Sequence, residues 1–221
     1  ETRYLTPIFG TEASDIEMPN KKINENPVSP QVAAEIIREY LKTEGNATQN
    51  LATFCQTYME PTATALMAEN FEKNAIDKDE YPMTADLENR CVDIIGNLWH
   101  MNPKEEPIGT STVGSSEACM LGGLAMLFRW KHLADKAGVN RFTKKRPNLV
   151  ISSGYQVCWE KFCRYWDIEM RTVPLDMEHL SLNMDTVMDY VDDYTIGIVA
   201  ILGITYTGKY DDVKALDKLV E

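Results

Sequence analysis

Two adjacent serines at the start of a predicted helix have the clearest chemical potential in this sequence. Ser115 and Ser116 follow Gly114 within the stretch GTSTVGSSEACMLGGLAM, residues 109–126. A helix N-terminus carries partial positive charge and unpaired backbone N–H groups, and neighbouring hydroxyls add further donors. Such a start binds anions readily, and a glycine lets the anion approach the backbone closely. On local pattern alone, the same residues also suit a capped helix without a ligand.

Other motifs that would define the anion or the chemistry are missing from the sequence. No Gly-Lys-Ser/Thr follows the serines and no G-x-G-x-x-G occurs, which weakens a nucleotide-binding α/β interpretation. There is no G-x-S-x-G nucleophile elbow. The three histidines are scattered and form no H-E-x-x-H pair, so we expect no metal site.

Composition narrows the class of protein. The 221 residues carry a formal net charge of −12, which argues against nucleic acid as a partner. No apolar run reaches transmembrane length, and we expect a cytoplasmic protein. Five cysteines without a C-x-x-C pair predict free thiols in packed positions.

Hydrophobic periodicity predicts the elements that position the serines. Residues 1–30, rich in Pro, Asn and charge, indicate a mobile or extended arm. Helices are then expected at 32–41, 61–71, 84–99 and 115–137. Strands at 148–153, 168–174 and 195–203 alternate with helices at 155–166, at 183–191 and from 211 onward. This alternation predicts a parallel α/β sheet. Its few strands suggest a sheet that continues in a longer polypeptide.

Several long stretches, in the same order, resemble glutamate decarboxylase of the bacterial and plant type, which uses pyridoxal 5′-phosphate (PLP). They are GTSTVGSSEACMLGGLAM (109–126), YQVCWEKFCRYWDIEMR (155–171), GNATQNLATFCQT (45–57), NAIDKDEYP (74–82) and GITYTGKYDDVKALDKL (203–219). The resemblance implies a large PLP domain of the aspartate-aminotransferase type with a mainly parallel sheet, preceded by an N-terminal helical segment. We expect residues 1–57 to form the arm, helix and substrate loop, and residues 58–221 an incomplete PLP domain.

The resemblance implies a role for each candidate cofactor residue. Ser115 and Ser116 would hold the 5′-phosphate. Gln156 follows a predicted strand, at the sheet edge where ligands of open α/β sheets collect, and would lie against the pyridine ring. Thr205 follows the strand predicted at 195–203 and would help to place the reacting group. From the pattern alone, Gln156 also suits a solvated helix start and Thr205 an ordinary turn.

The substrate implied by the resemblance is L-glutamate. Thr53 and Phe54 match the family's substrate loop and would contact the distal carboxylate, and Asn74 and Asp77 match positions that complete the pocket. Without the resemblance, these residues would be read as ordinary loop residues. The reaction would release CO₂ and γ-aminobutyrate (GABA) and consume a proton, which suits acid resistance.

Two groups that the chemistry needs do not occur in the sequence. The family's Schiff-base lysine lies in S-G-H-K and its pyridine-binding aspartate in H-V-D-A-A, and neither motif is present. We expect both beyond Glu221, and therefore expect this chain to carry no catalytic lysine and to be inactive alone.

The family forms homodimers, sometimes assembled into hexamers. The alternatives are a PLP decarboxylase for another amino acid and a non-catalytic fragment that binds phosphate or assembles with partners.

Overall fold

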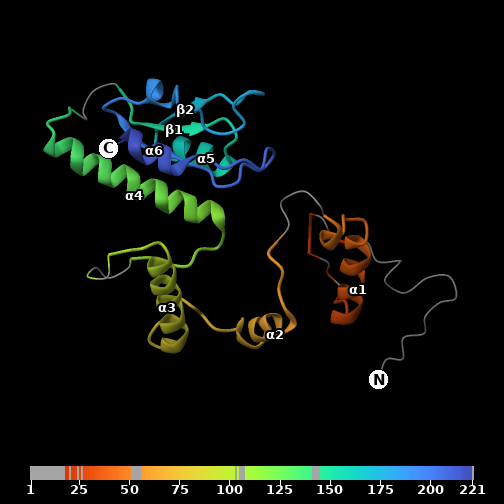
Figure 1. The fold of residues 1–221 in the computed structure, drawn as a ribbon. Helices are drawn as coiled ribbons and strands as arrows, with labels where there is room; N and C mark the ends of the chain where they lie inside the picture. Colours follow the sequence, from red (N-terminus) through yellow and green to blue (C-terminus); the bar gives the residue numbers. More distant parts are fainter. Residues whose placement is uncertain are drawn as a thin grey trace. The chain divides into compact units, whose positions relative to one another are not determined.

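A computed structural model describes residues 18–19, 21–23, 25, 27–50, 56–102, 104, 108–140 and 145–220 (Figure 1). The chain divides into two compact units, residues 1–64 and 65–221, and each is described by itself. Most of the arm predicted for residues 1–30 lies outside the described residues. The boundary predicted after residue 57 stays a prediction.

The first unit contains helix α1 (Pro30–Leu41) and a short 3₁₀ helix η2 (Ala47–Gln49). Ser29 caps α1 by accepting a hydrogen bond from the N–H of Val32 at 3.3 Å, and Pro30 occupies the first turn, where its missing N–H costs nothing. The predicted helix 32–41 is confirmed. Helix α2 (Pro61–Asn70) begins in this unit and ends in the second.

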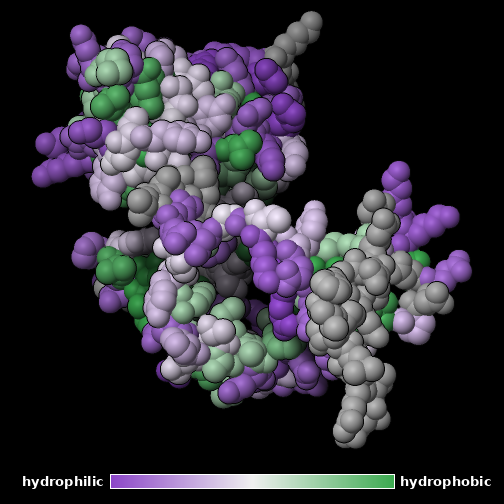
Figure 2. Space-filling view, turned by 90° about the vertical axis from the view of Figure 1, so that its right-hand side faces the viewer, coloured by the Kyte–Doolittle hydropathy of each residue, from purple (hydrophilic) through white to green (hydrophobic). Residues whose placement is uncertain are grey.

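Helix α3 (Pro82–Leu98) exposes a stripe of apolar side chains. Met83, Leu87, Ile94 and Leu98 recur at helical spacing along one face, and each is more than half exposed. Exposed apolar side chains that follow one face of a helix are typical of an interaction surface. In Figure 2, green hydrophobic areas lie among purple hydrophilic ones on the face turned to the viewer.

Three parallel strands form the sheet of the second unit. They are β1 (Asn148–Ser152), β2 (Glu169–Val173) and β3 (Thr195–Val199), in the spatial order β2-β1-β3. Every residue of the central strand β1 is buried, as expected for a parallel strand covered on both faces. The register of β1 against β3 shifts between Asn148 and Leu149. The predicted parallel α/β fold is confirmed, although β3 ends four residues earlier than predicted.

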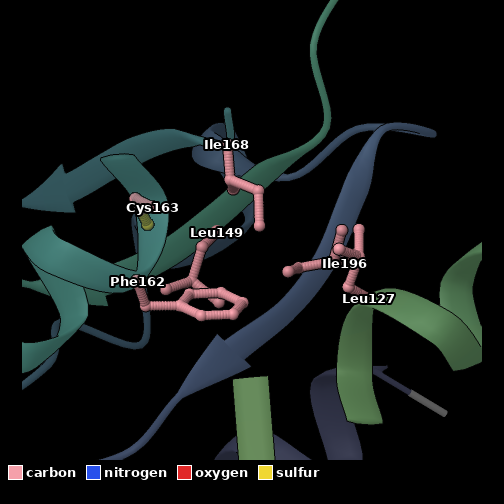
Figure 3. Close-up of a cluster of buried hydrophobic side chains, with 6 residues drawn as sticks. All are labelled: Leu127, Leu149, Phe162, Cys163, Ile168 and Ile196. Carbon is pink, nitrogen blue, oxygen red and sulfur yellow. The ribbon is translucent and has the colours of Figure 1, made fainter. Parts of the chain in front are cut away.

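One face of the sheet is covered by α4 (Ser115–Lys136) and α5 (Val157–Tyr165). Phe162 of α5 is fully buried against Leu149 of β1, and Figure 3 shows its ring turned toward Ile196 of β3. A side chain at Gly123 of α4 would place its Cβ 2.6 Å from Cζ of Phe162. The missing side chain at Gly123 therefore lets α4 and α5 pack closely over the strands.

The opposite face packs against α6 (Val213–Val220) and a 3₁₀ helix η3 (Val187–Tyr190). Val150 of β1 lies here with Leu216 of α6 and Val187 of η3. The helix predicted over 183–191 is wrong, because only these four residues are helical. The carbonyl of the Asn183 side chain accepts a hydrogen bond from the N–H of Asp185 at 2.9 Å, a local turn that competes with helix formation.

A charged network ties the three strands together at the amino edge of the sheet. Asp192 accepts hydrogen bonds from the side chain of Asn148 at 2.9 Å and from the N–H of Tyr194 at 2.8 Å. It also pairs with Lys145 at 2.9 Å and Arg171 at 3.0 Å. Burial opposes ionisation, but these donors outweigh it and hold the pKa of Asp192 well below its usual value.

Replacing Asp192 by Asn is expected to destabilise the protein by about 1–2 kcal/mol at neutral pH, because hydrogen bonds to a charged group are lost. Since the pKa of Asp192 is lower in the folded than in the unfolded state, its stabilisation is fully present above about pH 4 and is lost as the pH falls further. Urea unfolding between about pH 3 and pH 7 measures this. The matched control is Asp193→Asn, an exposed neighbour, and equal effects from both variants would contradict the prediction.

Candidate functional site

Helix α4 begins with an open set of hydrogen-bond donors. Gly114 is extended before the helix, and a Cβ there would meet no atom within 4 Å. The first helical bond runs from the N–H of Ala118 to the carbonyl of Gly114, so the N–H groups of the three preceding residues have no helical acceptor. Among the described residues, the exposed hydroxyls of Ser115 and Ser116 form no hydrogen bond. This start of a 22-residue helix fits an anion.

The acidic residue of the first turn does not compete for this position. The carboxylate of Glu117 accepts a hydrogen bond from the N–H of Val113 at 2.8 Å, so it is held by the loop before the helix. A carboxylate in the first turn is also favoured by the helix dipole. The Glu117 carboxylate is therefore engaged by the loop before the helix.

Glu88 of α3 anchors the loop that leads into α4. One oxygen, Oε1, accepts from the N–H and the hydroxyl of Ser111, both at 2.7 Å, and from the hydroxyl of Thr110 at 3.1 Å. The Ser111 N–H and hydroxyl, followed by the Thr110 hydroxyl, hold the pKa of Glu88 below its usual value. Sequence reasoning missed Glu88, because its partners lie more than 20 residues away.

Gln156 and Thr205 meet at the carboxyl edge of the sheet. The amide Nε2 of Gln156 donates a hydrogen bond to Oγ1 of Thr205 at 2.6 Å, across 49 positions in the sequence. Gln156 is the residue before α5, and its side chain is exposed. Thr205 lies in the loop after β3. Two residues predicted separately from strand ends are thus brought together.

Close packing behind this pair fixes the two loops. Gly154 lies where a Cβ would come within 2.7 Å of the side chain of Ile204, which is almost completely buried. Ile204 directly precedes Thr205, and Gly154 lies two residues before Gln156. The loop after β1 and the loop after β3 are therefore joined by the packing of the Ile204 side chain on Gly154 as well as by the Gln156–Thr205 hydrogen bond.

Two cysteines join the starts of α4 and α5. The thiols of Cys119 and Cys158 lie near each other where α4 and α5 pack together. Burial first, and the neighbouring thiol of Cys158 second, raise the pKa of Cys119 to about 11. Cys119 lies one turn after the serines, and Cys158 lies two residues after Gln156. This contact places the serine end of α4 beside the Gln156 end of α5. The described cysteines, which exclude Cys55, are free thiols; Cys158 and Cys163 are packed as predicted, whereas Cys91 is exposed.

The predicted substrate residues are less well defined. Thr53 and Phe54 lie outside the described residues. Asn74 and Asp77 form one turn before α3: Oδ1 of Asn74 accepts from the N–H of Ile76 at 3.3 Å, and Oδ1 of Asp77 accepts from the N–H of Glu80 at 3.0 Å. Within the described part of the chain, the hydrogen bonds of both side chains stay in this turn, so their role as pocket residues stays a prediction.

The described residues offer neither a cluster of metal ligands nor a helix suited to a membrane. No group of three or more His, Cys, Asp or Glu side chains is arranged to hold a metal ion in the ranges that the structure describes. No helix in those same ranges is long and apolar enough to cross a membrane.

Comparison with known proteins points to one family. Residues 21–221 match the model of the pyridoxal-dependent decarboxylase conserved domain. The chain is 60% identical over its whole length to a glutamate decarboxylase of Lactococcus lactis subsp. lactis, and covers 47% of that protein. It is 61% identical to glutamate decarboxylase beta of Listeria monocytogenes over 99% of the chain, again covering 47% of the relative. The chain thus spans about half the length of the curated relatives it matches.

Solved structures agree with this comparison. The structure of a Lactobacillus brevis glutamate decarboxylase matches 98% of the chain, with a TM-score of 0.88 and 59% identity, and the chain covers 49% of it. A sphingosine-1-phosphate lyase of Burkholderia pseudomallei shares the fold over 94% of the chain, with a TM-score of 0.74 at 18% identity, and the chain covers 48% of it.

Proposed function

Because the chain belongs to the pyridoxal-dependent decarboxylase family, we propose that it holds the cofactor of a glutamate decarboxylase, which converts L-glutamate to GABA and CO₂. One observation carries the proposal: the open, serine-rich start of α4 and the hydrogen-bonded pair Gln156–Thr205 occur in the same part of the fold. The neighbouring thiols of Cys119 and Cys158 lie between them. Relatives named glutamate decarboxylase at about 60% identity support the choice of substrate.

The residues at the start of α4 fit a phosphate ester. Ser115 and Ser116 offer hydroxyls without a partner in the described chain, and the space beside Gly114 is open. The helix dipole and the N–H groups of the first turn add positive potential. The Glu117 carboxylate accepts a hydrogen bond from the N–H of Val113, so it is bound to the loop before the helix and leaves the serines open to the anion. We therefore assign the 5′-phosphate of PLP to Ser115 and Ser116.

Gln156 and Thr205 would orient the cofactor and the reacting atoms. Their 2.6 Å hydrogen bond fixes the Gln156 amide, so that it can lie flat against an aromatic ring while Thr205 stays beside it. PLP, when bound, supplies an electron sink for the electron pair left when CO₂ departs. Residues 1–221 contain neither S-G-H-K nor H-V-D-A-A, so we propose that they bind and orient the cofactor without completing the catalytic set.

Substrate selection is assigned to the other predicted residues. We propose that Thr53 and Phe54 bind the distal carboxylate of glutamate, and that Asn74 and Asp77 complete this pocket. The turn that Asn74 and Asp77 form before α3 gives both side chains a defined backbone, which supports a role in shaping a pocket.

The setting of the enzyme is part of the proposal. We propose a cytoplasmic homodimer, assembled further into hexamers in some conditions, whose proton consumption serves acid resistance. Free thiols at Cys91, Cys119, Cys158 and Cys163 suit a reducing compartment. The exposed apolar stripe of α3 supports burial against another protein surface.

Protein expressed from the complete gene and supplied with PLP is expected to release GABA from L-glutamate and not to decarboxylate L-aspartate. Product analysis by mass spectrometry measures both reactions. Activity on aspartate but not glutamate would favour a decarboxylase for another amino acid.

Residues 1–221 alone, treated with PLP and borohydride, are expected to yield no stoichiometric lysine adduct on peptide mapping. A specific adduct with activity would show that the essential lysine lies within them.

A further inference from the structure

Asp211 is a buried carboxylate outside the predicted set of site residues. Only 3% of its surface is exposed. Its Oδ1 accepts from the N–H of Leu182 at 2.7 Å, and its Oδ2 accepts from the N–H of Ile201 at 2.7 Å. Both oxygens are therefore used, and both partners are backbone groups on segments distant in sequence. An acidic residue almost never lies this deep unless its partners require it.

The two ends of one loop are closed by Asp211. Its own N–H donates to the carbonyl of Ile201 at 3.0 Å, so Ile201 and Asp211 form a reciprocal pair. Leu202 and Tyr210 form a bridge directly inside this pair, and the N–H of Ile204 donates to the carbonyl of Lys209 at 2.9 Å. Residues 201–211 thus form a closed loop on the carboxyl edge of the sheet.

Thr205 lies inside this loop, immediately after Ile204. The side chain of Ile204 is 2% exposed and packs against Gly154, which fixes the loop on the segment that carries Gln156. Thr205 then accepts the 2.6 Å hydrogen bond from Gln156. The Asp211 carboxylate, by closing the loop and tying it to Leu182, determines where the Thr205 hydroxyl lies.

We propose that Asp211 is a positioning residue that holds Thr205 against Gln156 at the cofactor-binding edge of the sheet. The inference rests on the proposed function for what Thr205 and Gln156 do there. Asp211 touches neither of these side chains, so its effect on the reaction is indirect. Misplacement by about 1 Å from a change outside the reacting centre lowers a rate by up to about 100-fold.

The neighbouring carboxylate has a different role and provides the matched control. Oδ1 of Asp212 accepts from the N–H of Ala215 at 2.9 Å, which caps the start of α6. Asparagine caps a helix as well as aspartate does, so Asp212→Asn removes one charge and keeps the cap. Asp211→Asn removes the same charge one position earlier, but leaves an amide NH₂ facing a backbone N–H, because an asparagine side chain has only one acceptor oxygen.

The test uses protein expressed from the complete gene and loaded with PLP. Asp211→Asn is expected to lower kcat by about tenfold to 100-fold and to change KM for glutamate by less than about twofold. The absorbance spectrum of the bound cofactor is expected to shift, and amide hydrogen exchange in residues 201–205 to speed up. Asp212→Asn is expected to match the wild type in all four measurements.

A double-mutant cycle separates positioning from general stability. If Asp211 acts through Thr205, Asp211→Asn is expected to have little further effect on kcat in a Thr205→Ala background, whereas independent effects would multiply. Asp211→Glu keeps both acceptor oxygens, so its kcat is expected to lie between those of Asp211→Asn and the wild type. If Asp211→Asn does not fold, Asp211→Glu takes its place in the cycle. Multiplying effects in the cycle, or an Asp211 variant with wild-type kcat and spectrum, would overturn the proposal. A wild-type protein without decarboxylase activity would instead refute the proposed function, and hydrogen exchange would still report on the loop.

Discussion

Replacing both Ser115 and Ser116 by alanine is expected to weaken PLP binding by about 100-fold or more. Hydrogen bonds to a charged group contribute about 1.5–3 kcal/mol each, and this variant removes the two hydroxyl donors while keeping the backbone N–H groups. Both side chains are exposed, and alanine suits a helix, so the melting temperature of the cofactor-free protein is expected to change little. Titration of protein expressed from the complete gene, followed by cofactor absorbance, measures the affinity.

Two comparisons make this first prediction specific to the phosphate. Pyridoxal lacks the phosphate group, so its affinity is expected to be the same in the double variant and the wild type. Ser111→Ala removes a hydroxyl from the loop that leads into α4. Because that hydroxyl is hydrogen-bonded to Glu88, PLP affinity is expected to stay unchanged. If PLP and pyridoxal lose affinity equally in the double variant, the serines do not bind the phosphate.

Truncation of Phe162 to alanine is expected to have the largest effect on folding, a loss of about 3–5 kcal/mol of unfolding free energy. Phe162 is fully buried where α5, β1 and α4 meet, so the variant leaves a cavity among apolar side chains. Denaturant unfolding measures the loss. Phe128→Ala is the matched control, because Phe128 is 62% exposed on α4, and it is expected to cost less than about 1 kcal/mol.

Gly123 offers a second check on the same contact. Gly123→Ala alone is expected to destabilise the protein by about 1–3 kcal/mol, because its Cβ would lie 2.6 Å from the Phe162 ring. In the Phe162→Ala background the new methyl group enters the cavity, so the double variant is expected to be more stable than the sum of the single changes predicts. A strictly additive result would show that the two positions do not share a packing site.

Much of the fold follows from patterns that are local in sequence. The run 195–203 is almost continuously apolar and predicts a strand buried on both faces. A strand, β3, is found there, but only Ile196 of its five residues is buried, because β3 lies at the edge of the described sheet. Gly114, Ser115 and Ser116 indicate the start of a helix, and α4 begins at Ser115. The resemblance to glutamate decarboxylase is confirmed at the level of the family by the match over residues 21–221. The roles of individual site residues stay predictions.

Contacts between distant segments could not be predicted from local patterns. Asp211 and Asp212 are adjacent acidic residues at the start of the helix predicted from residue 211, yet Asp212 caps α6 while Asp211 is buried and accepts from the N–H groups of Leu182 and Ile201. Periodicity likewise does not report side-chain competition, which is why the helix predicted over 183–191 shortens to η3. Burial and partner identity arise only when the strands are assembled.

The parallel sheet separates two kinds of polar chemistry at its opposite edges. The Asp192 network lies where the strands begin, and Gln156 and Thr205 lie beyond where they end. Between these edges the central strand β1 is completely buried. Stability at low pH and the arrangement of Gln156 and Thr205 are therefore separate engineering problems. Substitutions selected at one edge for stability in acid are expected to combine freely with substitutions selected at the other edge.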